Sequence, residues 1–324
     1  MLSSALFLAF GFGSALLLTP LLRAAALRAS WLNSGAGNGT EPVPPIGGVA
    51  IAIATLLLLP FAPLSYPAGL WIGALGMGAI GFFDDKWPLS PFQKLGFQIF
   101  TVVIAVGSGL RFDTTGSTVV DAVLTGVWLV WMCNAFNVLD MMDGLSAGAG
   151  AIASIGLAGL GLVGGAAPVV ILGASLAGGF LGFLVYNAHP ARVYMGDAGS
   201  LFAGFVLGAM SVEISRAMTG VQGELCAILV LGVPCFEAVF LCIVRRRKGL
   251  PVMRASRDHV AQRLVGMGYS VRGAVRRIHL AGGLLALCGI VAAVVPAVIC
   301  FAIIVCVIVA AVWTGVRLAR VETA

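Results

Sequence analysis

The sequence predicts an all-α polytopic membrane protein that crosses the bilayer many times. Its 324 residues are 60% hydrophobic and only 10% charged, whereas a soluble domain carries about 25% charged residues. Apolar runs of about 20 residues, the length that a membrane-spanning helix needs, recur along the whole chain. The 44 glycines fit the same class, because small residues let helices approach one another closely in lipid. We expect a single integral membrane domain over residues 1–324.

Proline, glycine and charged clusters divide the apolar sequence into about eleven transmembrane spans, or ten if the Gly- and Ala-rich region 145–187 is divided differently. The first span has no Lys or Arg before Arg23. We interpret it as a retained helix, since a signal peptide normally begins with positive charge. Acids or basic clusters follow the third, fifth, seventh and ninth spans and mark their ends. The predicted spans are 3–22, 46–66, 68–83, 95–110, 121–139, 145–163, 167–187, 199–215, 223–244, 275–296 and 298–316.

The basic residues predict the orientation of these spans. All of the 19 Lys and Arg residues except Arg111 and Arg216 lie in the C-terminal tail or in loops after odd-numbered spans. The positive-inside rule therefore places these loops and the C-terminus in the cytoplasm and the N-terminus outside. The net charge of +6 is then an asymmetry across the membrane, and we expect no binding of nucleic acid. The expected cytoplasmic loops lie near 23–45, 84–94, 140–145, 188–198 and 245–274.

Adjacent acids end the third span in the segment GFFDDKW, residues 81–87. Negative charge at the C-terminal end of a helix opposes the helix dipole, and the neighbouring Asp84 and Asp85 repel each other. A bound cation or a nearby base would relieve both effects. A solvated helix end is the alternative interpretation.

The segment NAFNVLDMMDGLS, residues 134–146, places polar side chains at every third position: Asn134, Asn137, Asp140 and Asp143. On a helix this spacing spreads them over about half of the circumference. Their oxygens are hard donors, and Mg²⁺ prefers one or two carboxylates together with substrate phosphates and waters. The segment therefore favours a magnesium site that handles phosphate, with polar packing between helices as the alternative.

A third polar stretch contains the turn Gly-Asp-Ala-Gly-Ser, residues 196–200, at the start of the eighth span. Gly196 and Gly199 let the backbone approach a ligand closely. We expect Ser200 to cap the helix and its first N–H groups to face a phosphate. A phosphate and the carboxylate of Asp197 coexist there if a metal ion lies between them.

The longest polar loop, RRRKGLPVMRASRDHVAQRL at residues 245–264, is strongly basic. The guanidinium groups of Arg245, Arg246 and Arg247 match the oxygens of a diphosphate. Attraction to anionic lipid headgroups is the alternative for most of these residues. His259 is a candidate to donate to a phosphate or to transfer a proton.

Together and in this order, four stretches resemble the polyprenyl-phosphate N-acetylhexosamine-1-phosphate transferase superfamily. They are GFFDDKWPLSPFQKLGFQ, NAFNVLDMMDGLSAG, GFLVYNAHPARVYMGDAGSL and PCFEAVFLCIVRRRKGLPVMRASRDHVAQRL, within residues 81–264. The resemblance implies transfer of a sugar-1-phosphate from a UDP-N-acetyl sugar to undecaprenyl phosphate, releasing UMP. This reaction would begin cell-wall or O-antigen-like polysaccharide assembly. The implied cofactor is Mg²⁺, with Mn²⁺ as an alternative, and the implied location is the bacterial inner membrane with cytoplasmic catalytic loops. A homodimer is left open.

The resemblance also assigns roles to individual residues. The implied metal ligands are Asp197 and Asn137. The implied catalytic residues are Asp84, Asp85, Asp140, Asp143 and His259. The implied substrate-binding residues are Lys94, Asn134, Asn187, Arg245, Arg246 and Arg247.

The chain departs from the family pattern at a few positions. Met141 stands where a glycine is usual, and Ala261 and Gln262 stand where related enzymes often have histidines. The first cytoplasmic loop lacks the usual His and Lys and has Glu41 instead. These departures leave the identity of the sugar open.

Other classes fit the sequence less well. A secondary transporter would place ionisable groups near the middle of the bilayer, often in repeated halves, whereas these acids gather at one predicted face. A CDP-alcohol phosphotransferase requires an Ala-Arg pair after its Asp-Gly, but LSAGAGAIA follows Gly144. A purely scaffolding membrane protein would have no use for the four polar clusters.

Overall fold

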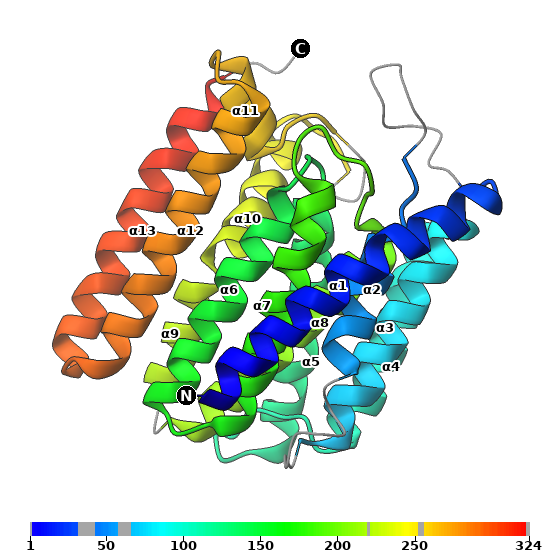
Figure 1. Cartoon of the computed structure of the whole chain (residues 1–324). Coiled ribbons are helices and arrows are strands. Elements are labelled where there is room, and N and C mark those ends of the chain that lie inside the picture. Colours follow the sequence, from blue (N-terminus) through cyan, green and yellow to red (C-terminus); the bar gives the residue numbers. More distant parts are fainter. Residues whose placement is uncertain (1, 32–42, 58–65, 219–220, 252–255, 322–324) are drawn as a thin grey trace.

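The structure is a computed structural model that describes residues 2–31, 43–57, 66–218, 221–251 and 256–321 (Figure 1). Within these ranges all regular secondary structure is helical, which confirms the predicted class. The helices are α1 (Leu2–Arg28), α2 (Gly47–Leu56), α3 (Ala68–Lys86), α4 (Pro91–Gly107), α5 (Thr118–Leu139), α6 (Leu145–Val163), α7 (Ala167–Asn187), α8 (Gly196–Ala217), α9 (Gln222–Val230), α10 (Gly232–Arg247), α11 (Val260–Gly266), α12 (Val271–Val294) and α13 (Ala297–Ala319).

Several of these helices have the length and composition of membrane spans, so the chain is a multi-pass membrane protein. Seven helices of the described residues qualify alone: α1, α5, α6, α7, α8, α12 and α13. The pair α9 and α10 forms an eighth span if its two bent parts are counted together, and α2 and α4 are shorter apolar helices. Every predicted span coincides at least in part with a helix, while the number eleven and the orientation stay predictions. Residues 58–65 of the second predicted span lie outside the described residues.

The ninth predicted span, 223–244, is broken into two helices that meet at an angle of 76°. The second of them, α10, begins at Gly232 and carries Pro234 in its first turn. Proline has no N–H, so it suits the start of a helix and interrupts the hydrogen bonding of a continuous one. The short helix α11, within the predicted loop 245–274, was not expected.

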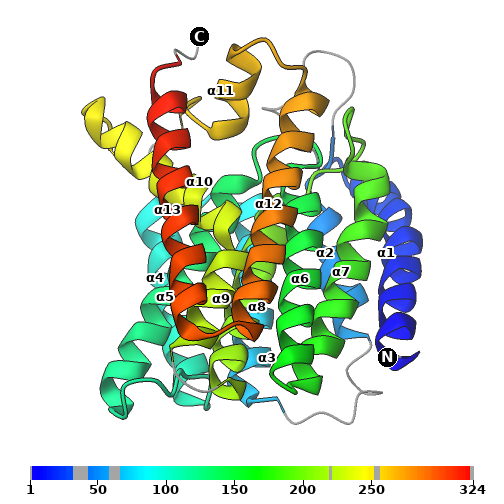
Figure 2. The ribbon, with the colours of Figure 1, turned by 90° about the vertical axis from the view of Figure 1, so that its left-hand side faces the viewer.

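Helix α8 lies at the centre of the bundle, between α3 and α5, and nearly all of it is buried. Helices α12 and α13 lie at one edge of the bundle (left in Figure 1), and α1 lies at another (right in Figure 2). Most helices run side by side, so their ends gather at two faces of the molecule (Figures 1 and 2). The first turn of α8 and the last turns of α3 and α5 therefore reach the same face.

Glycines bring the helices around α8 unusually close together. A Cβ atom at Gly81 of α3 would lie 2.1 Å from the carbonyl oxygen of Asp197. A Cβ atom at Gly48 of α2 would lie 2.1 Å from the Cα of Gly199. Any side chain at either position would separate these helices, so the glycines fix how closely Asp197 approaches α3.

Candidate active site

Polar side chains from α3, α4, α5 and α8 meet at one end of the bundle. The ammonium group of Lys94 lies 2.9 Å from Asp84 Oδ2 and also bonds the carboxylate of Asp197. The side-chain amide of Asn137 donates to Asp197 Oδ1 at 2.7 Å and to Ser200 Oγ at 2.9 Å. The α3–α4 region thus forms one connected network with α5 and α8, which are distant from it in the sequence. We call Asp84, Asp85, Asp140 and Asp197 the acid cluster.

Asp85 holds the start of α8. Its two carboxylate oxygens accept from the backbone N–H groups of Asp197 at 2.9 Å and Ala198 at 3.0 Å. We expected these N–H groups to face a phosphate, but these two are bonded to Asp85 instead. The prediction that Ser200 caps the helix is wrong, because α8 begins at Gly196 and Ser200 lies inside it without a capping hydrogen bond. An acid from α3 already occupies the N–H groups, and a charged acceptor there is stabilised by the helix dipole. The hydroxyl of Ser200 accepts from Asn137 instead.

The acid cluster carries more negative charge than its surroundings compensate. Among the described residues Lys94 is the cation that bonds it, through the carboxylates of Asp84 and Asp197. Burial raises the pKa of Asp140 to about 7, and the hydroxyl of Ser146, which donates to it, offsets only part of that effect. Burial also raises the pKa of Asp85 to about 7. This residue lies just after the predicted membrane span 68–83. Bringing another cation to this site would favour the ionised form of both acids.

The donor set of this cluster fits a magnesium ion that also binds substrate. Asp197 and Asn137 lie side by side and offer carboxylate and amide oxygens, once the amide is turned so that its oxygen faces Asp197. No group of three His, Cys, Asp or Glu side chains forms a complete metal site within the described ranges. Mg²⁺ usually takes one or two carboxylates and completes its shell with phosphates and waters.

A second set of contacts joins the turn after α5 to the segment after α7. Gly144 has a φ of 75°, which turns the chain sharply into α6. Its N–H donates to Asn187 Oδ1 at 3.0 Å, and Asn187 Nδ2 donates to the carbonyl of Val193 at 3.0 Å. In the same region Asp143 Oδ2 lies 2.7 Å from His189 Nδ1. Asn187 thus ties the two loops together.

The other predicted substrate-binding residues lie in different surroundings. Asn134 donates to Gln98 of α4 at 2.7 Å and to the carbonyl of Val130, both internal bonds. Arg245 is buried and donates to Ser256, whereas Arg246 and Arg247 are exposed. The structure does not place these arginines in the Lys94 network, and their predicted contacts with a diphosphate stay a prediction.

His259 is buried in a separate group of charges on α10 and α11. Its Nδ1 lies 3.0 Å from Glu237 Oε1, and the same oxygen accepts from the N–H of Val260 at 3.3 Å. Glu237 therefore orients His259. Sequence reasoning missed His189 and Ser146, which contact Asp143 and Asp140. The position of His189 in the stretch that leads to Asp197 is the only sequence feature that could have pointed to it, and no feature pointed to Ser146.

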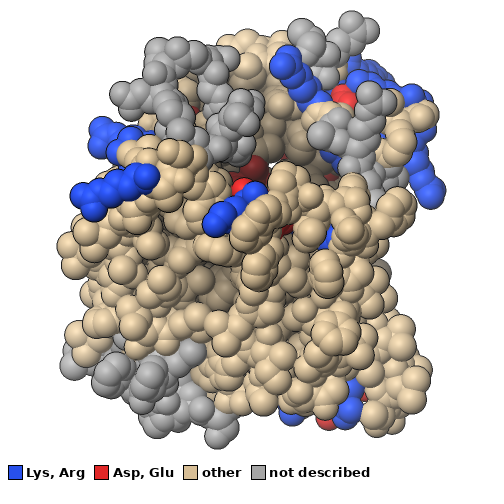
Figure 3. All heavy atoms as spheres, turned by 90° about the vertical axis from the view of Figure 1, so that its right-hand side faces the viewer, with Lys and Arg blue, Asp and Glu red and all other residues tan. Residues whose placement is uncertain are grey.

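The surface reflects this distribution of charge. Figure 3 shows acidic atoms on the floor of a hollow in the upper part of one face, with Lys and Arg atoms near it. The broad band below the hollow is almost free of visible charge, as expected for a surface in contact with lipid. The hollow therefore opens beside the apolar part of the molecule.

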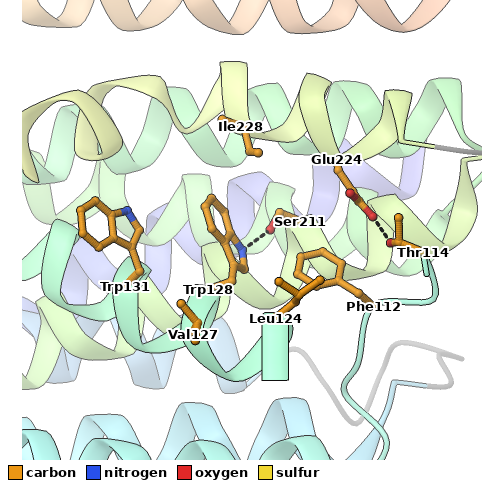
Figure 4. Close-up of a pocket in the computed structure, with 9 residues that line it drawn as sticks. All are labelled: Phe112, Thr114, Leu124, Val127, Trp128, Trp131, Ser211, Glu224 and Ile228. Atoms are coloured by element: carbon orange, nitrogen blue, oxygen red, sulfur yellow. Dashed lines mark hydrogen bonds between the residues drawn. The ribbon is translucent and has the colours of Figure 1, made fainter. Parts of the chain in front are cut away.

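A pocket of about 400 Å³ lies near the opposite ends of α5 and α8 (Figure 4). Trp128, whose Nε1 donates to Ser211 at 2.8 Å, and Trp131 form much of its apolar lining. The carboxylate of Glu224 accepts from the hydroxyls of Thr114 and Ser215. Because this acid is already bonded and its neighbours are apolar, the pocket does not resemble a site for phosphate chemistry.

Comparison with known proteins identifies close similarities. The family model described as "Glycosyl transferase family 4" matches residues 67–215, which hold the whole acid cluster but not the loop 245–264. "Probable undecaprenyl-phosphate N-acetylglucosaminyl 1-phosphate transferase" of Bacillus subtilis (strain 168) is 29% identical, over 85% of this chain and 81% of the relative.

Two further relatives extend the similarity. "Decaprenyl-phosphate N-acetylglucosaminephosphotransferase" of Mycolicibacterium smegmatis is 32% identical, over 76% of this chain and 71% of the relative. "Phospho-N-acetylmuramoyl-pentapeptide-transferase" of Desulforamulus reducens is also 32% identical, over 76% of this chain and 79% of the relative.

Proposed function

The chain belongs to the polyprenyl-phosphate N-acetylhexosamine-1-phosphate transferase family, and we propose that it transfers such a sugar-1-phosphate from a UDP-sugar to undecaprenyl phosphate. The comparisons confirm the predicted resemblance to this family, and membership makes the protein a membrane transferase. The products would be the undecaprenyl-diphosphate sugar and UMP. The observation that carries the proposal is the network in which Lys94 and Asn137 join Asp84 and Asp197 at one end of an apolar bundle.

The proposed reaction exchanges one phosphorus–oxygen bond for another. An oxygen of the lipid phosphate attacks the phosphorus that carries the sugar, and the bond from that phosphorus to the bridging oxygen of UMP breaks. Because both reactants are anionic, catalysis of this kind depends mainly on positioning and on charge neutralisation. The acceptor phosphate already carries the negative oxygen that attacks, so the step does not require a strong general base.

The side chains of the network suit these demands. Lys94 places its ammonium group between two carboxylates, which hold it in one position for a phosphate oxygen. Asp84 is itself held by the N–H of Leu89 at 2.7 Å, so it steers Lys94 from a fixed place. Asp140 and Asp143 lie on the α5–α6 turn, where we place the nucleotide of the donor. Asp85 contributes by fixing the start of α8, and with it Asp197.

We propose Mg²⁺ as the cofactor, with Mn²⁺ as a substitute, held by Asp197 and Asn137. A divalent ion would supply charge neutralisation for the diphosphate. We further propose that the site faces the cytoplasm at the inner membrane of a bacterium, because the basic loops share this end of the bundle. A product of this kind suits the first lipid-linked step of cell-wall assembly.

The test is an assay of the purified protein in detergent with labelled undecaprenyl phosphate and a panel of UDP-N-acetyl sugars. We expect UMP release and a labelled lipid product with at least one sugar, loss of both after EDTA, and recovery with Mg²⁺. Failure to release UMP with every sugar would reject the transferase proposal. Sugar-nucleotide uptake into vesicles without UMP release would instead indicate a transporter.

A further inference from the structure

A short series of contacts leads from the α5–α6 turn to the start of α12. Asp143 Oδ2 lies 2.7 Å from His189 Nδ1 and accepts from the N–H of Ala191 at 3.1 Å. The backbone carbonyl of His189 accepts from Nε and Nη2 of Arg272, at 3.1 and 2.8 Å. We call Asp143, His189 and Arg272 the donor-loop link. It connects three segments that are distant in sequence.

The geometry fixes what each group of the link does. An ionised carboxylate can only accept, so the Nδ1 of His189 carries the proton and donates it to Asp143. The fork of the Arg272 guanidinium makes two bonds to one carbonyl, which restrains the backbone at His189 as well as its side chain. Two donors, His189 and Ala191, therefore hold one oxygen of Asp143 in place.

The link borders the site of the proposed reaction. Asp140 lies close enough to both Asp197 and Asp143 for each of these charges to act on it. Asn187 joins the same two loops through Gly144 and Val193, which holds them together. The side chains of Asp143 and His189 are 21% and 40% exposed, so a ligand can reach them from solvent.

We propose that His189 is a positioning residue that holds the Asp143 carboxylate in the orientation that binds the nucleoside part of the UDP-sugar. This inference rests on the proposed function. A carboxylate acceptor suits the N–H and O–H groups of a uridine, and it binds them best when its own orientation is fixed beforehand. Arg272 of α12 restrains the backbone of His189 and does not itself contact Asp143 in the described contacts.

The experiment compares steady-state kinetics of variants with both substrates varied separately. His189→Ala should raise the KM for the UDP-sugar about tenfold, the effect of losing one hydrogen bond to a charged group. The kcat and the KM for undecaprenyl phosphate should change less than about twofold. His189→Asn should restore most of the donor affinity, because its amide nitrogen can donate from nearly the position of Nδ1. Arg272→Ala should raise the same KM by about threefold.

Arg276→Ala is the matched control for Arg272, because Arg276 is exposed one turn further along α12. It should leave all three constants unchanged. An unchanged donor KM in His189→Ala would overturn the proposal. So would equal behaviour of His189→Ala and His189→Asn, or a loss spread evenly over both substrates, which would indicate a role in folding. Absence of UMP release by the wild-type protein would instead reject the proposed function itself.

Discussion

The acid cluster and the group of charges on α10 and α11 are both partly buried, yet their charges are compensated very differently. In the acid cluster Lys94 pairs with Asp84 and Asp197, and no ion pair reaches Asp85 or Asp140 among the described residues. The second group, which we call the α10–α11 cluster, consists of Glu237, Lys248, Asp258, His259 and Arg263. There Asp258 Oδ1 lies 2.6 Å from Lys248 Nζ and 2.8 Å from Arg263 Nη2, and Glu237 meets His259.

This difference separates two uses of buried charge. A compensated cluster holds elements together, because removing one partner leaves the other buried without its counterion. Arg263 shows this role clearly, since it also donates to the carbonyls of Leu318 and Val321 at the end of α13. An undercompensated cluster is costly in the free protein and is relieved by a ligand of opposite charge, which is the mark of a functional site.

The largest effect that follows from the difference between the two clusters is expected at Asp197 of the acid cluster. Asp197→Asn keeps the size of the side chain but removes the charge that meets Lys94 and the proposed metal ion. We expect kcat/KM for UMP release to fall at least about 1,000-fold, equivalent to about 4 kcal/mol of barrier. The thermal unfolding temperature in detergent should change little, because Lys94 keeps its ion pair with Asp84 and the single amide oxygen of the variant can still accept from one of the two donors.

Asp113→Asn is the matched control for this variant, because Asp113 is an exposed acid beyond the other end of α4. It should retain wild-type turnover. Wild-type turnover by Asp197→Asn at saturating Mg²⁺ would contradict the metal assignment. Loss of activity together with loss of the folded protein would show that Asp197 is structural.

The second prediction concerns the compensated cluster and measures stability. Arg263→Met removes the buried guanidinium that bonds Asp258 and the last carbonyls of α13. We expect unfolding to become easier by about 3 kcal/mol, as for other broken buried ion pairs. UMP release per folded molecule should stay within about twofold of the wild type. Thermal unfolding and the kinetic assay on the same preparation measure both.

Lys248→Met tests whether burial decides the size of that effect. Lys248 bonds the same carboxylate, but its side chain is 46% exposed. Solvent screens such a pair, so we expect a loss below about 1 kcal/mol. Equal destabilisation by both variants would contradict the distinction between the two cations.

Much of the fold could be predicted, because the cost of exposing backbone groups to lipid requires long apolar helices. Each predicted span therefore coincides at least in part with a helix. The break between α9 and α10 was missed although Gly232 and Pro234 mark it, because apolar composition alone does not distinguish a straight span from a bent one. Helix α11 was missed since its seven residues are too few for a clear period.

The site could be predicted in composition but not in its connections. Motif spacing selected Asp84, Asp197 and Asn137, which the structure joins. It could not show that Asp85 bonds the first N–H groups of α8, because that contact joins positions 112 residues apart. For the same reason the internal bonds of Asn134 and the tie made by Asn187 needed the fold.

The last prediction asks whether the α10–α11 cluster is only structural. His259 belongs to that cluster through Glu237, yet the sequence assigns it a catalytic role. His259→Ala should lower kcat/KM at least tenfold, about 1.4 kcal/mol of barrier, if the imidazole also meets a substrate phosphate. Glu237→Gln is the companion variant, because it keeps an acceptor for Nδ1 while removing the charge. It should cost less activity than His259→Ala if orientation of the ring is what Glu237 provides. An unchanged rate in His259→Ala with a lowered unfolding temperature would show that His259 is structural. The α10–α11 cluster would then only stabilise the fold, whereas the acid cluster carries the reaction.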